Sequence, residues 1–194
     1  MSREEDPKLI EFYNKAYDFS LKNYKNELGW IEQLKPENIT DCKFLSEYIW
    51  VVLCSGFKVS LAGKISDKLK ENSDLNVIKH PLKRKAIGIA YDNYKNWFKH
   101  LKSLKTDEQK LEFLDSLPHI GAITKYHLAK NIGLNFAKPD VHLTRLAQSF
   151  GYEDVQVFCE IAGKKLGHRK NVVDQVLWRY CEQNSNYLEE LKIK

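Results

Sequence analysis

The residues with the clearest chemical potential form a short run in the second half of the chain. The run Leu117-Pro118-His119-Ile120-Gly121 predicts a tight turn, and the residues after it predict a helix. A turn between two short helices leaves the backbone N–H groups at the start of the second helix exposed, where the helix dipole adds partial positive charge. Gly121 also allows the backbone to approach a phosphate closely. We therefore expect an anion site here, and contacts of this kind can hold DNA without reading its base sequence.

This run resembles a helix-hairpin-helix motif. The resemblance continues nineteen residues beyond Gly121, where the sequence reads Lys138-Pro139-Asp140-Val141-His142. The hairpin, a loop with Gly133 near its start, and the aspartate together resemble the signature of the HhH-GPD superfamily of base-excision DNA glycosylases. Residues 44–58 resemble the early core helix of that superfamily, and residues 174–178 resemble the closing helix of the archaeal 8-oxoguanine DNA glycosylases.

The resemblance implies a fold class and a domain organisation. The fold would be all-α, with two helical subdomains, a helix-hairpin-helix motif and a DNA-binding cleft between the subdomains. The whole chain, residues 1–194, would be one such unit, with the hairpin motif at about 107–132 and the catalytic loop at about 133–142. The expected partner is double-stranded DNA with a damaged or modified base, which the protein would flip out at a cost of a few kcal/mol.

Asp140 is the expected catalytic residue. Cleavage of an N-glycosidic bond builds positive charge on the deoxyribose, and a carboxylate near C1′ stabilises that charge and orients the attacking nucleophile. Ile123 occupies the position at which the strand-nicking members of the superfamily carry a lysine that forms a Schiff base. Lys125 lies about 200° around the helix from it, so we expect a monofunctional glycosylase with water as nucleophile. Lys58 is the alternative source of an amine.

The resemblance also suggests which residues bind the base and the DNA. Phe57 and Trp178 are candidates for stacking on an extruded base, and Asp174 for accepting a hydrogen bond from a base N–H. Core packing is the alternative for both aromatic side chains. The candidates for DNA contact are His119, Gly121, Thr124, Lys125, Lys138 and Arg145. His119 stands where the superfamily usually has glycine, so it either contacts DNA or is merely tolerated by the turn.

The sequence predicts the substrate less specifically than it predicts the fold. An oxidised purine such as 8-oxoguanine comes first, because residues 174–178 carry the resemblance to 8-oxoguanine glycosylases. An alkylated purine or a modified cytosine is the alternative substrate. A non-catalytic helix-hairpin-helix DNA-binding module is the rival from another functional class.

Composition is compatible with a DNA-binding protein. The chain has 194 residues and a net charge of +5, and this charge is unevenly distributed. Residues 1–41 hold six Lys/Arg against nine Asp/Glu, residues 79–110 hold nine against three, and residues 117–170 hold eight against four. Phosphate binding and an ordinary solvated helix face both explain the two basic segments.

The cysteine spacing and the first residues argue against a metal protein, a secreted protein and a membrane protein. None of the four cysteines forms a C-x-x-C pair, so we expect neither a metal site nor an iron–sulfur cluster, and no cofactor. The first residues are acidic and lack the apolar stretch of a signal peptide, and no apolar run is long enough to cross a bilayer. We expect a monomer in the cytoplasm, associated with the nucleoid in a prokaryote.

Helical periodicity covers almost the whole chain. Asp6-Pro7 predicts the start of a first helix that runs to Leu34, Thr106 with Gln109 predicts a capping box, and Asp140 predicts the N-cap of another helix. Trp30, Trp50 and Trp97 are expected in the core. The further helices are expected at 41–54, 59–71, 81–104, 106–116, from the hairpin to 132, and at 141–150, 154–166 and 171–183.

Overall fold

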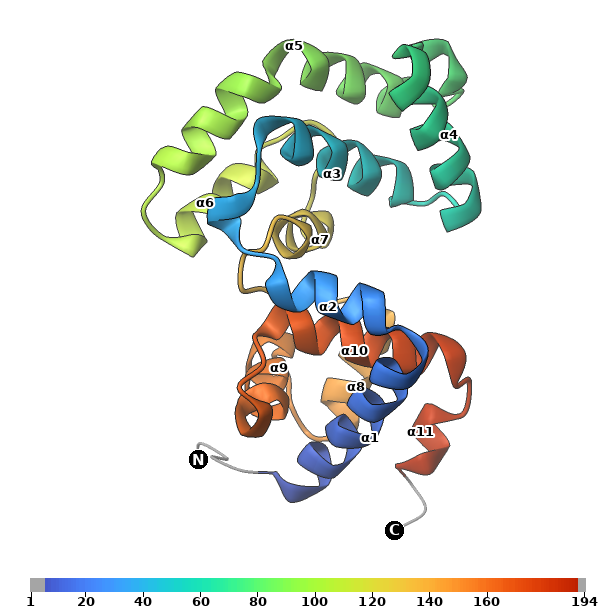
Figure 1. Ribbon diagram of the computed structural model, residues 1–194, viewed down its shortest axis with the longest axis vertical. Helices are drawn as coiled ribbons and strands as arrows, with labels where there is room; N and C mark the ends of the chain where they lie inside the picture. The colour runs from blue at the N-terminus through green and yellow to red at the C-terminus, as the bar shows by residue number, and fades with distance from the viewer. Residues whose placement is uncertain (1–5, 192–194) are drawn as a thin grey trace. The chain divides into compact units, whose positions relative to one another are not determined.

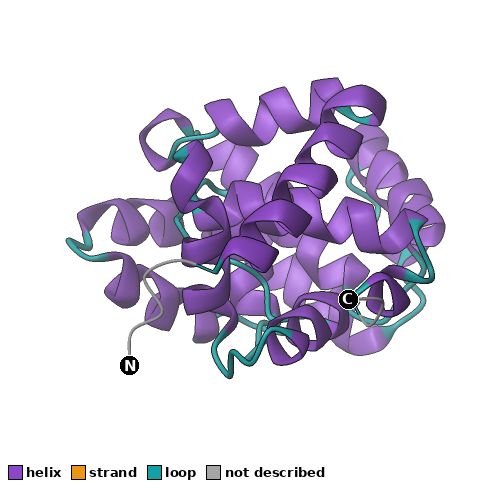
Figure 2. Cartoon of the chain, turned by 90° about the horizontal axis from the view of Figure 1, so that it is seen from below, coloured by secondary structure: helices purple, strands orange, loops and turns teal. Residues whose placement is uncertain are grey.

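All regular secondary structure in the described part of the chain is helical, as the sequence predicts (Figure 1). The computed structural model describes residues 6–191; the acidic residues at the start of the chain lie outside this range. Residues 6–191 form eleven α-helices and three short 3₁₀ helices, with no strand (Figure 2). Within the described range, no helix is both long and apolar enough to cross a membrane.

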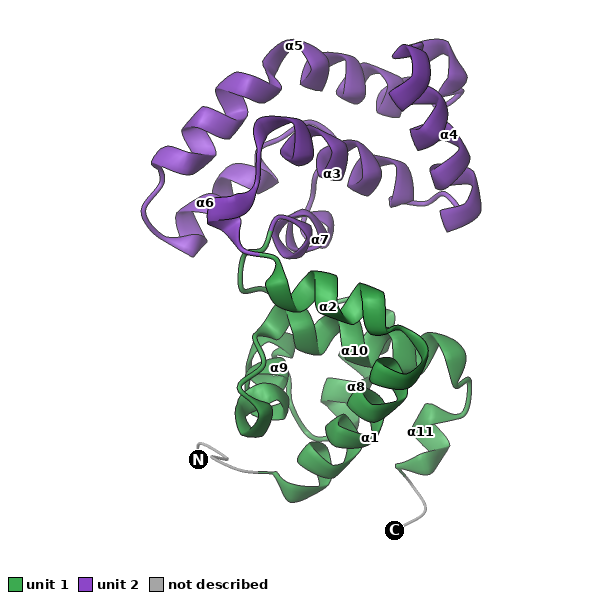
Figure 3. Ribbon diagram, in the orientation of Figure 1, with its two compact units in different colours: residues 1–34, 133–194 green, residues 35–132 purple. Residues whose placement is uncertain are grey.

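The chain divides into two compact units (Figure 3). Unit 1 comprises both ends of the chain, residues 1–34 and 133–194, and unit 2 comprises residues 35–132. Unit 1 holds α1 (Pro7–Asn23), α2 (Lys25–Gln33), α8 (Val141–Ser149), α9 (Val155–Gly163), η3 (Lys164–Leu166), α10 (Lys170–Gln183) and α11 (Tyr187–Glu190). Unit 2 holds η1 (Pro36–Asn38), α3 (Asp41–Cys54), α4 (Val59–Asn72), η2 (Leu75–Val77), α5 (Pro81–Ser103), α6 (Asp107–Asp115) and α7 (Thr124–Asn131).

Each unit has its own central helix. In unit 1, α10 buries nine of its residues and packs against α1, α2, α8 and α9. In unit 2, α3 packs against α4, α5 and α7 and buries Phe44 and Tyr48 completely. Burial of large apolar side chains on these two helices supplies the main driving force for folding of each unit.

The helix starts follow the capping signals in the sequence. The Asp6 side chain accepts a hydrogen bond from Leu9 N at 3.1 Å, with Pro7 at the first helical position. Thr106 and Gln109 form the predicted capping box. These contacts satisfy backbone N–H groups that have no partner within their helix.

Two predictions for the N-terminal region are wrong. The first helix does not continue to Leu34 but breaks at Tyr24, whose N–H still donates to Ser20 O while its ψ of 33° leaves the helical region. Trp30 is 39% exposed rather than buried. On α2 the inward positions are Leu28 and Ile31, and Trp30 lies about 200° around the helix from Leu28. The other two tryptophans in question, Trp50 and Trp97, are half-buried.

Candidate active site

The hairpin turn in unit 2 places a histidine in a glycine conformation. Ile120 N donates a hydrogen bond to Leu117 O at 3.1 Å, which closes a turn with Pro118 and His119 at its centre. His119 has φ of 62°, in the left-handed region that a type II turn requires at this position. A side chain there costs roughly 1–2 kcal/mol in backbone sterics, which explains why glycine is the ordinary residue.

The start of α7 presents unoccupied backbone donors. Gly121 N donates to Thr124 Oγ1 at 2.8 Å, and Lys125 N donates to Gly121 O at 3.0 Å. Among residues 6–191, the N–H groups of Ala122, Ile123 and Thr124 have no hydrogen-bond acceptor. A Cβ atom added to Gly121 would meet nothing within 4 Å, so internal packing does not require glycine here. The arrangement leaves donors available to an anion at a helix N-terminus.

Ile123 and Lys125, which the sequence resemblance relates to strand cleavage, occupy different environments. Ile123 is 44% exposed and carries no amine to attack a sugar. The Lys125 ammonium pairs with Asp115 at 2.9 Å, at the end of α6. In the free protein this ion pair holds the Lys125 amine at α6.

A cluster of rings and one buried lysine supports the turn. The ring centroids of His119 and His80 lie 6.1 Å apart, and those of His80 and Phe57 lie 6.2 Å apart. The Lys83 ammonium lies 4.6 Å from the Phe57 ring centroid and donates to Ser55 O at 2.5 Å and to Val52 O, where it satisfies the last carbonyls of α3. Burial, together with the charges of Lys83 and His80, holds the pKa of His119 below its ordinary value.

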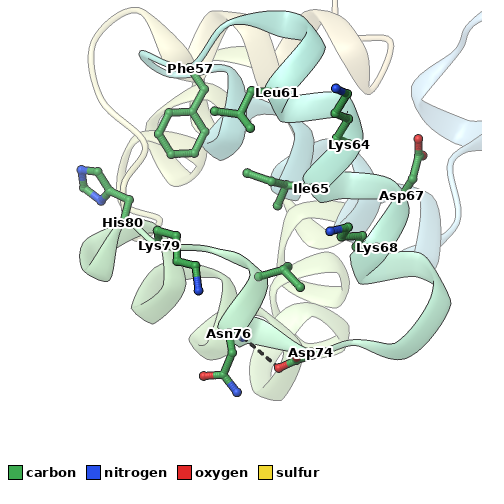
Figure 4. Close-up of a pocket in the computed structure, with 11 residues that line it drawn as sticks. Phe57, Leu61, Lys64, Ile65, Asp67, Lys68, Asp74, Asn76, Lys79 and His80 are labelled. Carbon is green, nitrogen blue, oxygen red and sulfur yellow. Dashed lines mark hydrogen bonds between the residues drawn. The ribbon is translucent and has the colours of Figure 1, made fainter.

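Phe57 lines a groove along α4, which we call the α4 groove (Figure 4). The groove has a volume of about 1040 Å³ and continues to His80 at the start of α5. Its apolar lining comes from Phe57, Leu61, Ile65 and Val77, and its lysines are Lys64, Lys68 and Lys79. Within unit 2, Phe57 therefore belongs both to this groove and to the group of rings beside the hairpin turn.

Asp140, in unit 1, caps α8 with one of its two carboxylate oxygens. Oδ1 accepts hydrogen bonds from His142 N at 3.0 Å and Leu143 N at 3.1 Å, so the predicted N-cap is confirmed. Among the described residues, Oδ2 accepts no hydrogen bond, and the Lys138 ammonium lies 3.9 Å from it. The helix N-terminus stabilises the negative charge of the carboxylate. Oδ1 thus fixes the side chain, whereas Oδ2 is held only by the longer ion pair with Lys138.

The loop before Asp140 is held by side chains from two other helices. Gln156 of α9 accepts a hydrogen bond from Ala137 N at 2.9 Å and donates one to Ala137 O at 2.7 Å. Asp174 of α10 accepts one from Lys138 N at 2.5 Å and is 2% exposed. Gln156 could not be predicted from the sequence, because nothing in its local pattern distinguishes it from other glutamines on helix surfaces.

The remaining candidates also fall in unit 1. Trp178 is half-buried on α10, with the Arg179 guanidinium carbon 4.6 Å from its ring centroid. Arg145 is exposed on α8. In the described part of the chain, no group of three or more His, Cys, Asp or Glu side chains is arranged to hold a metal ion.

Known proteins match this chain in fold but not in sequence. No protein-family model matches it, and no curated protein matches it in sequence. The crystal structure of Methanocaldococcus jannaschii 8-oxoguanine glycosylase/lyase in complex with a 15mer DNA containing 8-oxoguanine matches with TM-score 0.70 and 16% identity, over 89% of this chain and 97% of that chain. The 8-oxoguanine DNA glycosylase of Thermotoga maritima matches with TM-score 0.71 and 16% identity, over 91% and 97%. The all-α fold implied by the sequence resemblance is confirmed, and the chain has the fold of these two glycosylases.

Proposed function

We propose that this protein is a DNA glycosylase that extrudes a damaged base from duplex DNA and hydrolyses its N-glycosidic bond. The observation that carries the proposal is the arrangement of Asp140, whose Oδ1 is fixed by two backbone N–H groups while Oδ2 is left available. The likeness in fold to 8-oxoguanine glycosylases supports an oxidised purine such as 8-oxoguanine as the substrate.

The reaction needs a fixed negative charge close to the sugar. As the N-glycosidic bond breaks, positive charge develops at C1′ of the deoxyribose, and the Asp140 carboxylate stabilises it. The same carboxylate orients a water molecule and takes its proton as the water attacks C1′. The cap contacts to His142 N and Leu143 N hold the side chain in one rotamer, so little reorganisation is needed during the reaction.

Water rather than an amine is the nucleophile in this proposal. Ile123 stands at the position where the superfamily signature of strand-nicking members has lysine, and its side chain cannot form a Schiff base. The protein would then release the base and leave the strand intact. In this respect it would differ from the M. jannaschii protein, which is named a glycosylase/lyase.

DNA binding is assigned to the hairpin and to basic side chains near Asp140. The free N–H groups at the start of α7 would bind one phosphate, close to His119, Gly121, Thr124 and Lys125. Lys138 and Arg145 would contact the backbone near the extruded nucleotide. Phe57 and Trp178 remain the proposed base-contacting residues, whereas Asp174 is 2% exposed and its carboxylate accepts from Lys138 N, so we assign it to the support of the loop instead. Action on DNA would place the protein in the cytoplasm, at the nucleoid in a prokaryote.

Mass spectrometry of released bases tests the proposal. The wild-type protein and Asp140→Asn are incubated with duplexes that carry 8-oxoguanine, an alkylated purine or a modified cytosine. We expect 8-oxoguanine from the wild type and none from the variant. Release of another base would support the proposed reaction but would correct the proposed substrate. If the wild type binds these duplexes but releases no base, the protein is a non-catalytic DNA-binding module.

A further inference from the structure

We propose that Gln156 is a positioning residue that holds the loop carrying Asp140 in its reactive place. This inference rests on the proposed glycosylase function. Gln156 contacts neither Asp140 nor the start of α8; it binds the loop three residues earlier. It therefore acts through the backbone, and its effect on the reaction is separable from that of the catalytic carboxylate.

The contact itself is a two-point clamp. Gln156 Oε1 accepts from Ala137 N and Nε2 donates to Ala137 O, so one amide group satisfies both polar atoms of one residue. Ala137 is completely buried, and its backbone has little access to water as a substitute partner. Gln156 is fixed at its own end, because its N–H donates to the Asp154 carboxylate at 2.6 Å at the start of α9.

A short series of contacts connects the clamp to Asp140. Lys138 N donates to the Asp174 carboxylate at 2.5 Å, and Lys138 O accepts from Asp140 N at 2.8 Å. Pro139 fixes one of the two backbone dihedral angles between them. Residues 137 to 140 therefore have few ways to move while Gln156 holds Ala137, and removal of Gln156 leaves both polar atoms of Ala137 without this partner.

Removal of the clamp should lower the rate of base release more than it weakens the binding of lesion DNA. A displacement of about 1 Å at a catalytic group can reduce a rate by about 100-fold. In Gln156→Ala the cap of α8 by Asp140 is retained, so α8 and the DNA-contacting side chains keep their places. We expect the single-turnover rate of base release to fall about 10- to 100-fold, with the dissociation constant for lesion duplex within about two-fold of wild type.

A second variant gives a signature that a merely structural role would not produce. In Gln156→Glu the ionised carboxylate still accepts from Ala137 N but faces Ala137 O without a proton to donate. Once protonated, it restores both contacts. Partial burial raises the pKa of the new glutamate, and so does the Asp154 carboxylate, which accepts from the N–H of residue 156. The rate of Gln156→Glu relative to wild type should therefore rise as pH falls from about 8 to about 5.5, whereas that of Gln156→Ala should stay flat.

The experiment combines single-turnover release of 8-oxoguanine, duplex affinity and hydrogen exchange of residues 133–140. Gln148→Ala, an exposed glutamine on α8, is the matched control and should match wild type in all three. Faster loop exchange with a lower rate and unchanged affinity supports the proposal. Unchanged loop exchange in Gln156→Ala, or faster exchange with an unchanged rate, overturns it. Absence of base release by the wild type refutes the proposed function and the catalytic role with it, and loop exchange then still reports whether the clamp exists.

Discussion

On the proposed function the two oxygens of Asp140 would have separate tasks, a cap of α8 and a charge beside the sugar, and three substitutions distinguish them. Asn retains an oxygen that accepts from His142 N and Leu143 N but removes the negative charge. Ser also caps a helix and leaves no group in place of Oδ2. Ala removes both the cap and the charge. The three variants should therefore differ in stability, with Ala the least stable, but all three should lose base release.

The contacts of Asp140 determine the expected change in the free energy of unfolding and in the rate of base release. Asn and Ser rank with Asp as N-caps, so the free energy of unfolding should change by less than about 0.5 kcal/mol. Ala leaves two N–H groups at the start of α8 without their acceptor and should cost about 1 kcal/mol, which corresponds to roughly 2–4 °C in Tm for a chain of this size. Loss of the charge should reduce base release in all three variants, by about 10²- to 10⁴-fold.

Single-turnover base release and thermal unfolding, measured on the same preparations, provide the assay. Asp6→Ala is the matched control, because Asp6 caps α1 in the same unit through Leu9 N and should lose stability without losing rate. A rate that follows stability, with Asn and Ser active and Ala inactive, would show that Asp140 is only a cap. Wild-type release by Asp140→Asn would refute the catalytic assignment outright.

Three further predictions concern other parts of the chain. Borohydride should not trap the wild-type protein on lesion DNA, whereas Ile123→Lys should be trapped; efficient trapping of the wild type would show that another amine, such as that of Lys58, has replaced the usual lysine. His119→Gly should keep or raise stability at pH 7.5. It should also weaken the loss of stability between pH 7 and 5, because a histidine whose folded pKa lies below its unfolded value opposes folding as pH falls; an unchanged slope in urea-unfolding measurements would contradict this. Arg169→Lys should lower the urea midpoint by the equivalent of about 1–3 kcal/mol, since a lysine cannot reach both Gly133 O and the carbonyls at the end of α2; a midpoint equal to that of wild type would contradict the structural role of the guanidinium.

Local signals in the sequence predicted the helices well, because caps and prolines act within one turn. Pro81 begins α5, the Thr106 capping box begins α6, and Asp140 begins α8. The helix predicted at 154–166 is α-helical to Gly163 and continues as the 3₁₀ helix η3. The spacing of apolar residues does not distinguish an α-helix from a short 3₁₀ extension at its end.

Contacts between distant residues explain what the sequence could not predict. The break at Tyr24 has no proline or glycine signal, and it lies beside Arg179, whose guanidinium carbon is 4.9 Å from the Tyr24 ring centroid. Gln156 and Ala137 are nineteen residues apart and meet only because α9 packs beside the loop. The resemblance to the HhH-GPD signature pointed to Asp140 and the hairpin, but not to the side chains that hold them.

The conformation of His119 bears on how the hairpin works. A turn with only a structural task would be more stable with glycine, because a left-handed φ costs a side chain roughly 1–2 kcal/mol. Strained residues of this kind cluster at functional sites, where other contacts hold them in place. Here the His80 ring lies against the imidazole, and the lowered pKa leaves it neutral near pH 7. A neutral imidazole offers one N–H donor and one acceptor nitrogen and adds no charge. On the proposed function, the hairpin would hold DNA through the backbone N–H groups of α7, and His119 would contribute shape and uncharged hydrogen bonds.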